Sequence, residues 1–63
     1  MTPSERLARF RHDLANPLSA ILAEAELDLQ QAESLPPEIT ASLQAIHDAA
    51  IRMRAVLREG ASD

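Results

Sequence analysis

Three neighbouring side chains in the first third of the chain are of types that can transfer a chemical group. His12 is followed at once by a carboxylate, Asp13, and an amide, Asn16, comes one helical turn later. A neutral imidazole is a competent nucleophile near pH 7, and an adjacent carboxylate can orient the ring or accept its proton. An amide can hydrogen-bond a phosphoryl group or a water without adding charge. The spacing therefore predicts nucleophilic chemistry at His12.

Pro17 stands beside these residues, within a segment that otherwise has the pattern of a regular helix. A proline in a helix interior removes a hydrogen bond and costs roughly 3 kcal/mol. Its missing N–H leaves the carbonyl of Asp13 without a helical partner and permits a bend there. We interpret Pro17 as a kink residue that serves chemistry at His12, because it does not serve stability.

The element that holds this motif is predicted to be a long helix. Thr2 and Glu5, three residues apart, have the pattern of a capping box, and apolar residues at spacings of three and four then extend a helix over about residues 3–33. At 100° per residue, His12 lies about 140° from the centre of the apolar stripe, and therefore on the outward face. An exposed histidine without a role is the alternative that this position leaves open.

A second helix is predicted after a turn at about residues 34–36. Two successive prolines break the first helix and suit the start of the next, which should run over about 37–59 and stop at Gly60. Its apolar residues again alternate at spacings of four and three. Met53 belongs to this stripe and is interpreted as core. His47 falls at the edge of the stripe and is interpreted as a half-exposed boundary residue.

The two stripes predict the fold class, an all-α, antiparallel two-helix hairpin that forms a single domain over residues 1–63. Each stripe is too wide for one neighbouring helix to cover, and a chain of this size buries only about 60% of its unfolded surface. Four-helix bundles give each helix two neighbours. We therefore expect two copies of the hairpin to form a homodimer with a four-helix core.

Composition narrows the classes of function. The chain has no cysteine, so no thiolate metal site is expected, and His12 and His47 lie too far apart in sequence for a local metal motif. A formal net charge of −4 argues against binding to nucleic acid, and no apolar run is long enough to cross a membrane. All six basic residues are arginines: Arg6, Arg9, Arg11, Arg52, Arg54 and Arg58. They form either solvated helix faces or a mildly positive field that favours an incoming phosphate at His12.

The segment from His12 to Ile21, HDLANPLSAI, resembles the H-box of sensor histidine kinases. That pattern is His, acid, Leu, any residue, Thr or Asn, Pro, Leu, Ser or Thr, any residue, Ile, and every fixed position is met. The second helix resembles the partner helix of the same family's dimerisation and histidine phosphotransfer domain (HisKA type), through Leu43 with Ile46 and the Arg-Met pair at 52–53. The resemblance covers most of the chain.

The resemblance implies a role for each residue of the motif. His12 would be the phosphoacceptor, and Asp13 would be its acid–base partner in autophosphorylation. Asn16 would position a water when the same domain removes phosphate from its response regulator, and Pro17 would be the kink residue. Domains of this kind dimerise as four-helix bundles, in agreement with the homodimer expected from the stripes.

The resemblance also implies partners outside this chain. ATP and Mg²⁺ would bind a separate catalytic domain and this chain would hold no cofactor, because its single glycine, Gly60, cannot form a phosphate-cradling loop. A response-regulator receiver domain would take the phosphoryl group, docking near His12 against small exposed residues such as Ala15, Ser19 and Ala23. The domain would be cytoplasmic, including as the cytoplasmic part of a membrane-bound sensor.

Three interpretations are open from the sequence. The first is a domain excised from a larger histidine kinase, which the end of the chain soon after the second helix favours. The second is a stand-alone histidine phosphotransfer protein that a separate kinase serves. The third is a structural dimerisation hairpin without phosphotransfer. Acid-labile phosphate on His12 would separate the first two interpretations from the third.

Overall fold

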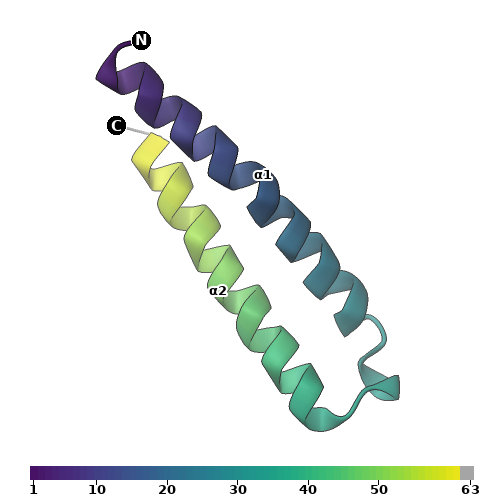
Figure 1. The fold of residues 1–63 in the computed structure, drawn as a ribbon. Coiled ribbons are helices and arrows are strands. Elements are labelled where there is room, and N and C mark those ends of the chain that lie inside the picture. The colour runs from purple at the N-terminus through teal and green to yellow at the C-terminus, as the bar shows by residue number, and fades with distance from the viewer. Residues whose placement is uncertain (62–63) are drawn as a thin grey trace.

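Two long antiparallel helices make up the computed structural model, which describes residues 1–61 (Figure 1). Helix α1 spans Pro3–Leu29 and helix α2 spans Pro37–Ala61, and a short 3₁₀ helix, η1, lies between them at Ala32–Ser34. No strand occurs in the described part of the chain. The predicted all-α hairpin is therefore confirmed.

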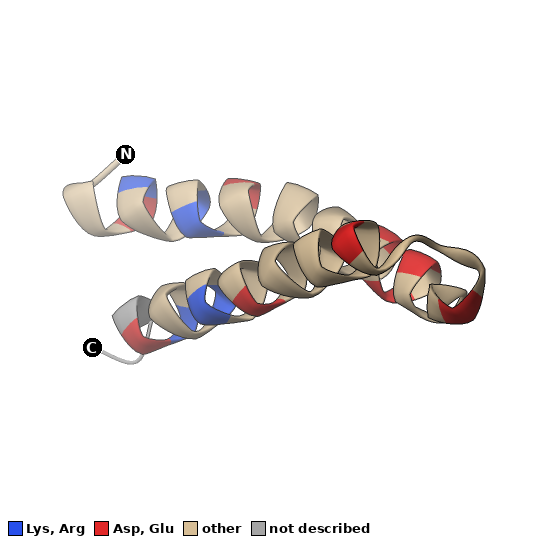
Figure 2. Ribbon diagram, turned by 90° about the horizontal axis from the view of Figure 1, so that it is seen from below, with Lys and Arg blue, Asp and Glu red and all other residues tan. Residues whose placement is uncertain are grey.

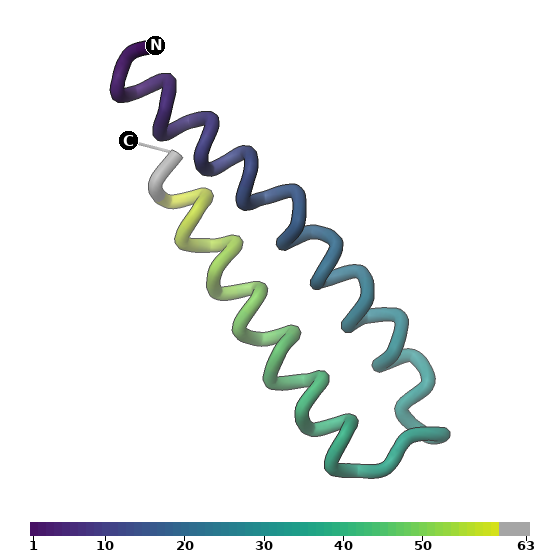
Figure 3. The backbone as a smooth tube through the Cα atoms, in the orientation of Figure 1, coloured from purple at the N-terminus to yellow at the C-terminus, as the bar shows by residue number. Residues whose placement is uncertain are grey.

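The hairpin is elongated, with principal extents of 49 × 16 × 13 Å. The start of α1 and the end of α2 lie at the same end of the molecule, and the connection lies at the other (Figure 3). The helices are farther apart at the end with the termini and cross near the connection (Figure 2). The arginines all lie in the half with the termini. Neither described helix contains a stretch that is long and apolar enough to span a membrane.

Thr2 and Glu5 close the start of α1. The backbone N–H of Glu5 donates to the Thr2 hydroxyl oxygen at 3.1 Å, and the backbone N–H of Thr2 donates to the Glu5 carboxylate at 3.3 Å. These reciprocal bonds form a capping box, and Pro3 occupies the first helical position, where a missing N–H costs nothing. The helix therefore satisfies its first backbone groups with its own side chains.

The end of α1 comes earlier than the apolar pattern suggests, since that pattern extends the helix to about residue 33. The helix ends at Leu29, and the chain then tightens into η1, where the backbone N–H of Ser34 donates to the Gln31 carbonyl at 3.0 Å. The Ser34 hydroxyl donates to the same carbonyl at 2.8 Å. These three-residue bonds replace the four-residue bonds of an α-helix. Because Ala32 fits either helix type, the spacing did not reveal the change.

Helix α2 begins at Pro37 and continues to Ala61, beyond the end expected at about residue 59. The expectation that Gly60 stops the helix is wrong. No described glycine has a positive φ, so Gly60 does not adopt the left-handed conformation of a glycine cap. Glycine in a helix costs about 1 kcal/mol relative to alanine, which weakens the helix without ending it.

The core between the two helices is small. Leu18, Leu22 and Ala25 of α1 and Ala50 of α2 are each 5% exposed or less, and Leu57 packs against this group. Full burial of a leucine side chain contributes about 1.5–3 kcal/mol, whereas an alanine adds less. The buried residues therefore hold the middle of the hairpin together more firmly than its ends.

One side of the hairpin leaves large apolar residues uncovered. We define the apolar face as six of them: Phe10, Leu14 and Ile21 of α1, and Ile46, Met53 and Val56 of α2. At 100° per residue, the three α1 residues lie within about 40° of one another. Phe10 is 60% exposed, and Met53, which was expected in the core, is 53% exposed. Met53 is not core in the single hairpin because α1 covers only part of the α2 stripe.

Candidate functional site

His12 projects into solvent from the outer side of α1. Its side chain is 75% exposed. At 100° per residue it lies about 180° around the helix from the α1 part of the apolar face. The turns before and after it are regular helix, because α1 is continuous from Pro3 to Leu29. The imidazole is therefore carried by an ordered element and remains accessible to a partner.

Asp13 lies beside His12 without a hydrogen bond to it. The nearest atoms, Nδ1 of His12 and Oδ1 of Asp13, are 3.8 Å apart, which is within ion-pair range and beyond hydrogen-bond range. Both side chains are largely exposed, so small rotations can bring the carboxylate into contact with Nδ1. With Nδ1 on the carboxylate side, Nε2 is the ring nitrogen left for an external group.

The other two predicted residues take different positions around α1. Asn16 is exposed, one turn further along and about 40° around the helix from His12, so the amide and the imidazole share one side. Pro17 lies about 140° from His12, so it acts on the site only through the backbone. The helix passes through Pro17 unbroken. The motif thus keeps a helical arrangement of side chains while Asp13 lacks the hydrogen bond that its carbonyl would otherwise accept.

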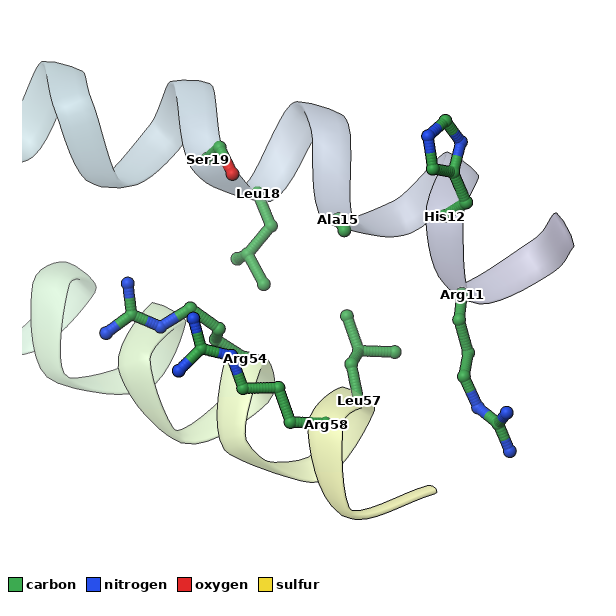
Figure 4. Close-up of a pocket in the computed structure, with 8 residues that line it drawn as sticks. All are labelled: Arg11, His12, Ala15, Leu18, Ser19, Arg54, Leu57 and Arg58. Carbon is green, nitrogen blue, oxygen red and sulfur yellow. The ribbon is translucent and has the colours of Figure 1, made fainter. Parts of the chain in front are cut away.

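A groove runs between the helices on the side that carries His12 (Figure 4). We call it the His12 groove, and its volume is about 260 Å³. The residues that line it are Arg11, His12, Ala15, Leu18 and Ser19 of α1, and Arg54, Leu57 and Arg58 of α2. Its floor is apolar, and its lining includes three arginines and no carboxylate. The groove therefore connects the exposed imidazole to a surface that both helices build.

Comparison with known protein families gives a match over nearly the whole hairpin. The family described as the His Kinase A (phospho-acceptor) domain matches residues 4–59. The chain belongs to this family. Comparisons with curated proteins and with solved structures gave no match. The matched segment contains the complete motif from His12 to Ile21 and all the residues that line the His12 groove.

Membership confirms the resemblance that the motif and the second helix suggested. The hairpin is a phospho-acceptor domain of the His Kinase A family. The individual roles of His12, Asp13, Asn16 and Pro17 stay predictions. The imidazole, the carboxylate and the amide lie within little more than one turn of α1, and Pro17 follows them in the same helix.

The sequence named Arg54 and Arg58 only among six arginines that could form a positive field at His12, and it did not predict their place beside the imidazole. Their spacing places them at the edge of the α2 stripe, where arginine is ordinary. The signal that could have found them is the hairpin itself. When two helices of similar length run antiparallel through a short connection, the last turns of α2 must lie opposite the first turns of α1. That pairing brings Arg54 and Arg58 to the groove beside His12.

The second histidine lies in a different environment. The His47 side chain on α2 is 17% exposed, and its Nε2 is 3.2 Å from Oε1 of Glu26 on α1. Its Nδ1 is buried without a hydrogen-bond partner, 3.9 Å from Oδ1 of Asp48. The predicted boundary position of His47 is confirmed, but the contact to Glu26 is new. No group of three or more potential metal ligands occurs among the described residues.

Proposed function

We propose that this hairpin is the dimerisation and phosphoacceptor domain of a two-component sensor histidine kinase. In this proposal His12 receives the γ-phosphoryl group of ATP from a separate catalytic domain, which binds the nucleotide and Mg²⁺. The observation that carries the proposal is the exposed imidazole on the side of α1 opposite the apolar face, within a chain that belongs to the phospho-acceptor family.

The chemistry of acceptance follows from the arrangement of His12 and Asp13. The Nε2 lone pair attacks the γ-phosphorus, a nitrogen–phosphorus bond forms, and the bond to the departing ADP oxygen breaks. The ring becomes cationic, and Asp13, which lies on the Nδ1 side at 3.8 Å, stabilises or accepts the Nδ1 proton. In the second transfer a receiver carboxylate oxygen attacks the same phosphorus. The nitrogen–phosphorus bond then breaks with its electron pair left on Nε2. The proton that Asp13 stabilised or accepted is again on Nδ1, so the ring returns to its neutral form.

The proposed domain is a homodimer in which a second copy covers the apolar face. That face carries six large apolar side chains that the hairpin does not bury, and burial contributes about 25 cal/mol per Å² of apolar surface. Because His12 lies on the opposite side of α1, covering the apolar face leaves both imidazoles outward on the flanks of a four-helix bundle. Sedimentation equilibrium tests the assembly, since the proposal requires a dimer.

Asn16 has the proposed role of positioning a water for removal of phosphate from the receiver. The amide shares the outward side with His12 and can hydrogen-bond a water without adding charge. Asn16→Ala should therefore leave phosphoryl acceptance by His12 intact and slow dephosphorylation of the receiver by about 10²-fold. Both rates are measured with radiolabelled phosphate. Unchanged dephosphorylation would remove Asn16 from the mechanism.

The decisive experiment is phosphorylation of the hairpin by phosphoramidate, followed by phosphorus NMR and mass spectrometry. We expect one acid-labile phosphoryl group on His12, absent in His12→Gln and retained in the matched variant His47→Gln. The second histidine is a useful control because it is only 17% exposed and contacts Glu26. A dimer whose His12 never accepts phosphate, under conditions that phosphorylate a known acceptor domain, would contradict the proposal. It would favour a purely structural hairpin.

A further inference from the structure

The charge on the His12 groove is one-sided. Its lining includes Arg11 of α1 and Arg54 and Arg58 of α2, and none of the lining residues is acidic. Arg54 and Arg58 are four residues apart and so lie one above the other on α2. Within the described part of the chain, neither side chain makes a hydrogen bond or an ion pair. The net charge of the chain is −4, so this concentration of positive charge is local.

The arginines of α2 are poorly placed for a phosphoryl group on His12. Figure 4 shows both side chains running past Leu18 toward Ser19 rather than toward the imidazole. Ser19 follows His12 by seven residues, which is about 10 Å along a helix. Long helical side chains lean toward the N-terminus of their own helix, and in α2 that direction leads away from His12. The two guanidinium groups therefore serve a neighbouring surface.

The groove has the character of a binding site for an amphipathic helix. Ala15, Leu18 and Leu57 supply an apolar floor, and the small side chains of Ala15 and Ser19 leave room for a close approach. A helix that lays its apolar side on this floor places its flanking residues against Arg54 and Arg58. Carboxylates at those flanking positions complement the guanidinium charges, whereas lysines there repel them.

We propose that Arg54 and Arg58 select the protein that docks at the His12 groove by recognising carboxylates on its docking helix. The inference rests on the proposed function, because the occupant is the receiver protein that takes phosphate from His12. It adds the property by which receivers are selected, which is the charge on the docking helix. A receiver whose docking helix carries acidic residues beside its apolar face is accepted, and one with basic residues there is rejected. Arg54 and Arg58 act in specificity and do not touch the reacting atoms.

Two synthetic amphipathic helical peptides test the inference directly. They share one Leu/Ala face and differ only in two flanking positions four residues apart, which are Glu in one peptide and Lys in the other. Binding to the intact hairpin is followed by NMR shifts of the Leu18 and Leu57 methyl groups. We expect the Glu peptide to bind about tenfold more tightly than the Lys peptide at low salt, and the difference to shrink as salt is added.

Charge reversal supplies the matched variants. Arg54→Glu with Arg58→Glu should reverse the preference toward the Lys peptide, and Arg54→Gln with Arg58→Gln should abolish it. Arg52→Glu changes the same residue type on the same helix outside the groove lining, so it should keep the preference for the Glu peptide. Circular dichroism and sedimentation check that each variant is folded and dimeric. Loss of the dimer in the Arg54 and Arg58 variants would show that the groove belongs to a contact between copies, and would overturn the inference.

The remaining outcomes separate this inference from the proposed function. Equal binding of the two peptides, no binding of either, or a preference unchanged in the charge-reversed variant would overturn the selection role. So would inorganic phosphate that shifts the same methyl signals as strongly as the Glu peptide. Phosphoramidate labelling of His12 is measured on the same samples. If His12 accepts no phosphate while the peptide preference holds, the proposed function fails and the acidic-helix site stands.

Discussion

On one side of the hairpin the exposed side chains are apolar, with Phe10, Leu14 and Ile21 of α1 beside Met53 of α2. The opposite side carries the exposed imidazole of His12, where a groove lined in part by arginines begins. Both sides belong to the same two helices and share the same buried seam. They differ because the helical period sends alternate groups of residues to opposite sides.

The two sides therefore suit two different tasks in a small chain. The apolar face suits assembly with a second copy, and the His12 side suits phosphoryl chemistry. Apolar surface that is left in water favours a partner through burial, which needs shape and little direction. A nucleophile and its neighbours need exposure and a fixed geometry, which a helix provides when another part of it bears the packing. The two sides should therefore respond differently to the same kind of substitution.

A charge on the apolar face should have the largest effect. Ile21→Asp places an unpaired carboxylate where a second copy is expected to pack, and an uncompensated buried charge costs about 3–5 kcal/mol. We expect the variant to be monomeric and largely unfolded, because a chain of this size has a marginal core without a partner. Sedimentation and circular dichroism measure both changes. Ala23→Asp, on the opposite side of α1, makes the same charge change and should remain a folded dimer.

Removing Pro17 tests whether the proline beside His12 lowers the free energy of unfolding. Pro17→Ala restores the N–H that the carbonyl of Asp13 lacks, so the free energy of unfolding should rise by up to about 3 kcal/mol. Thermal unfolding of the dimer at fixed protein concentration measures this change. Phosphoryl acceptance and transfer should be slower in the same variant, because the backbone beside His12 becomes a regular helix. A more stable variant with unchanged phosphotransfer rates would mean that Pro17 has no part in the chemistry.

The contact between Glu26 and His47 should have the smallest effect. Its two atoms are 3.2 Å apart, but the Glu26 side chain is largely exposed, so solvent screens the interaction. A double-mutant cycle with Glu26→Ala and His47→Ala should give a coupling energy below about 1 kcal/mol in thermal or urea unfolding. A coupling energy of about 2 kcal/mol or more would instead place this contact among the determinants of helix pairing.

The features that the sequence predicted are those set by local patterns. The capping pair Thr2 and Glu5, the outward position of His12 and the start of α2 at Pro37 each depend on residues a few positions apart. The early end of α1 escaped prediction because an apolar residue at 32 fits a 3₁₀ turn as well as an α-helix. The helical period could not resolve that difference.

The features that escaped prediction entirely depend on contacts between the helices. Arg54 reaches the His12 groove, and Glu26 reaches His47, only because α1 and α2 pair in one particular register. The spacing of apolar residues predicts which side of each helix faces its neighbour. It does not predict how far one helix is shifted along the other. Met53 shows the same point for burial, since it follows the stripe pattern yet lies exposed in the single hairpin.

The placement of the buried residues has a consequence for amide hydrogen exchange. Leu18, Leu22, Ala25 and Ala50 lie toward the middle of the hairpin, and the helices spread apart toward the end with the termini (Figure 2). Opening from that end breaks fewer apolar contacts than opening the whole molecule, so protection of the amides should rise along α1 from its first turns to Leu22. His12 lies between the first turns of α1 and Leu22, so the protection of its amide should be intermediate. Its backbone therefore opens and closes many times for each complete unfolding of the domain.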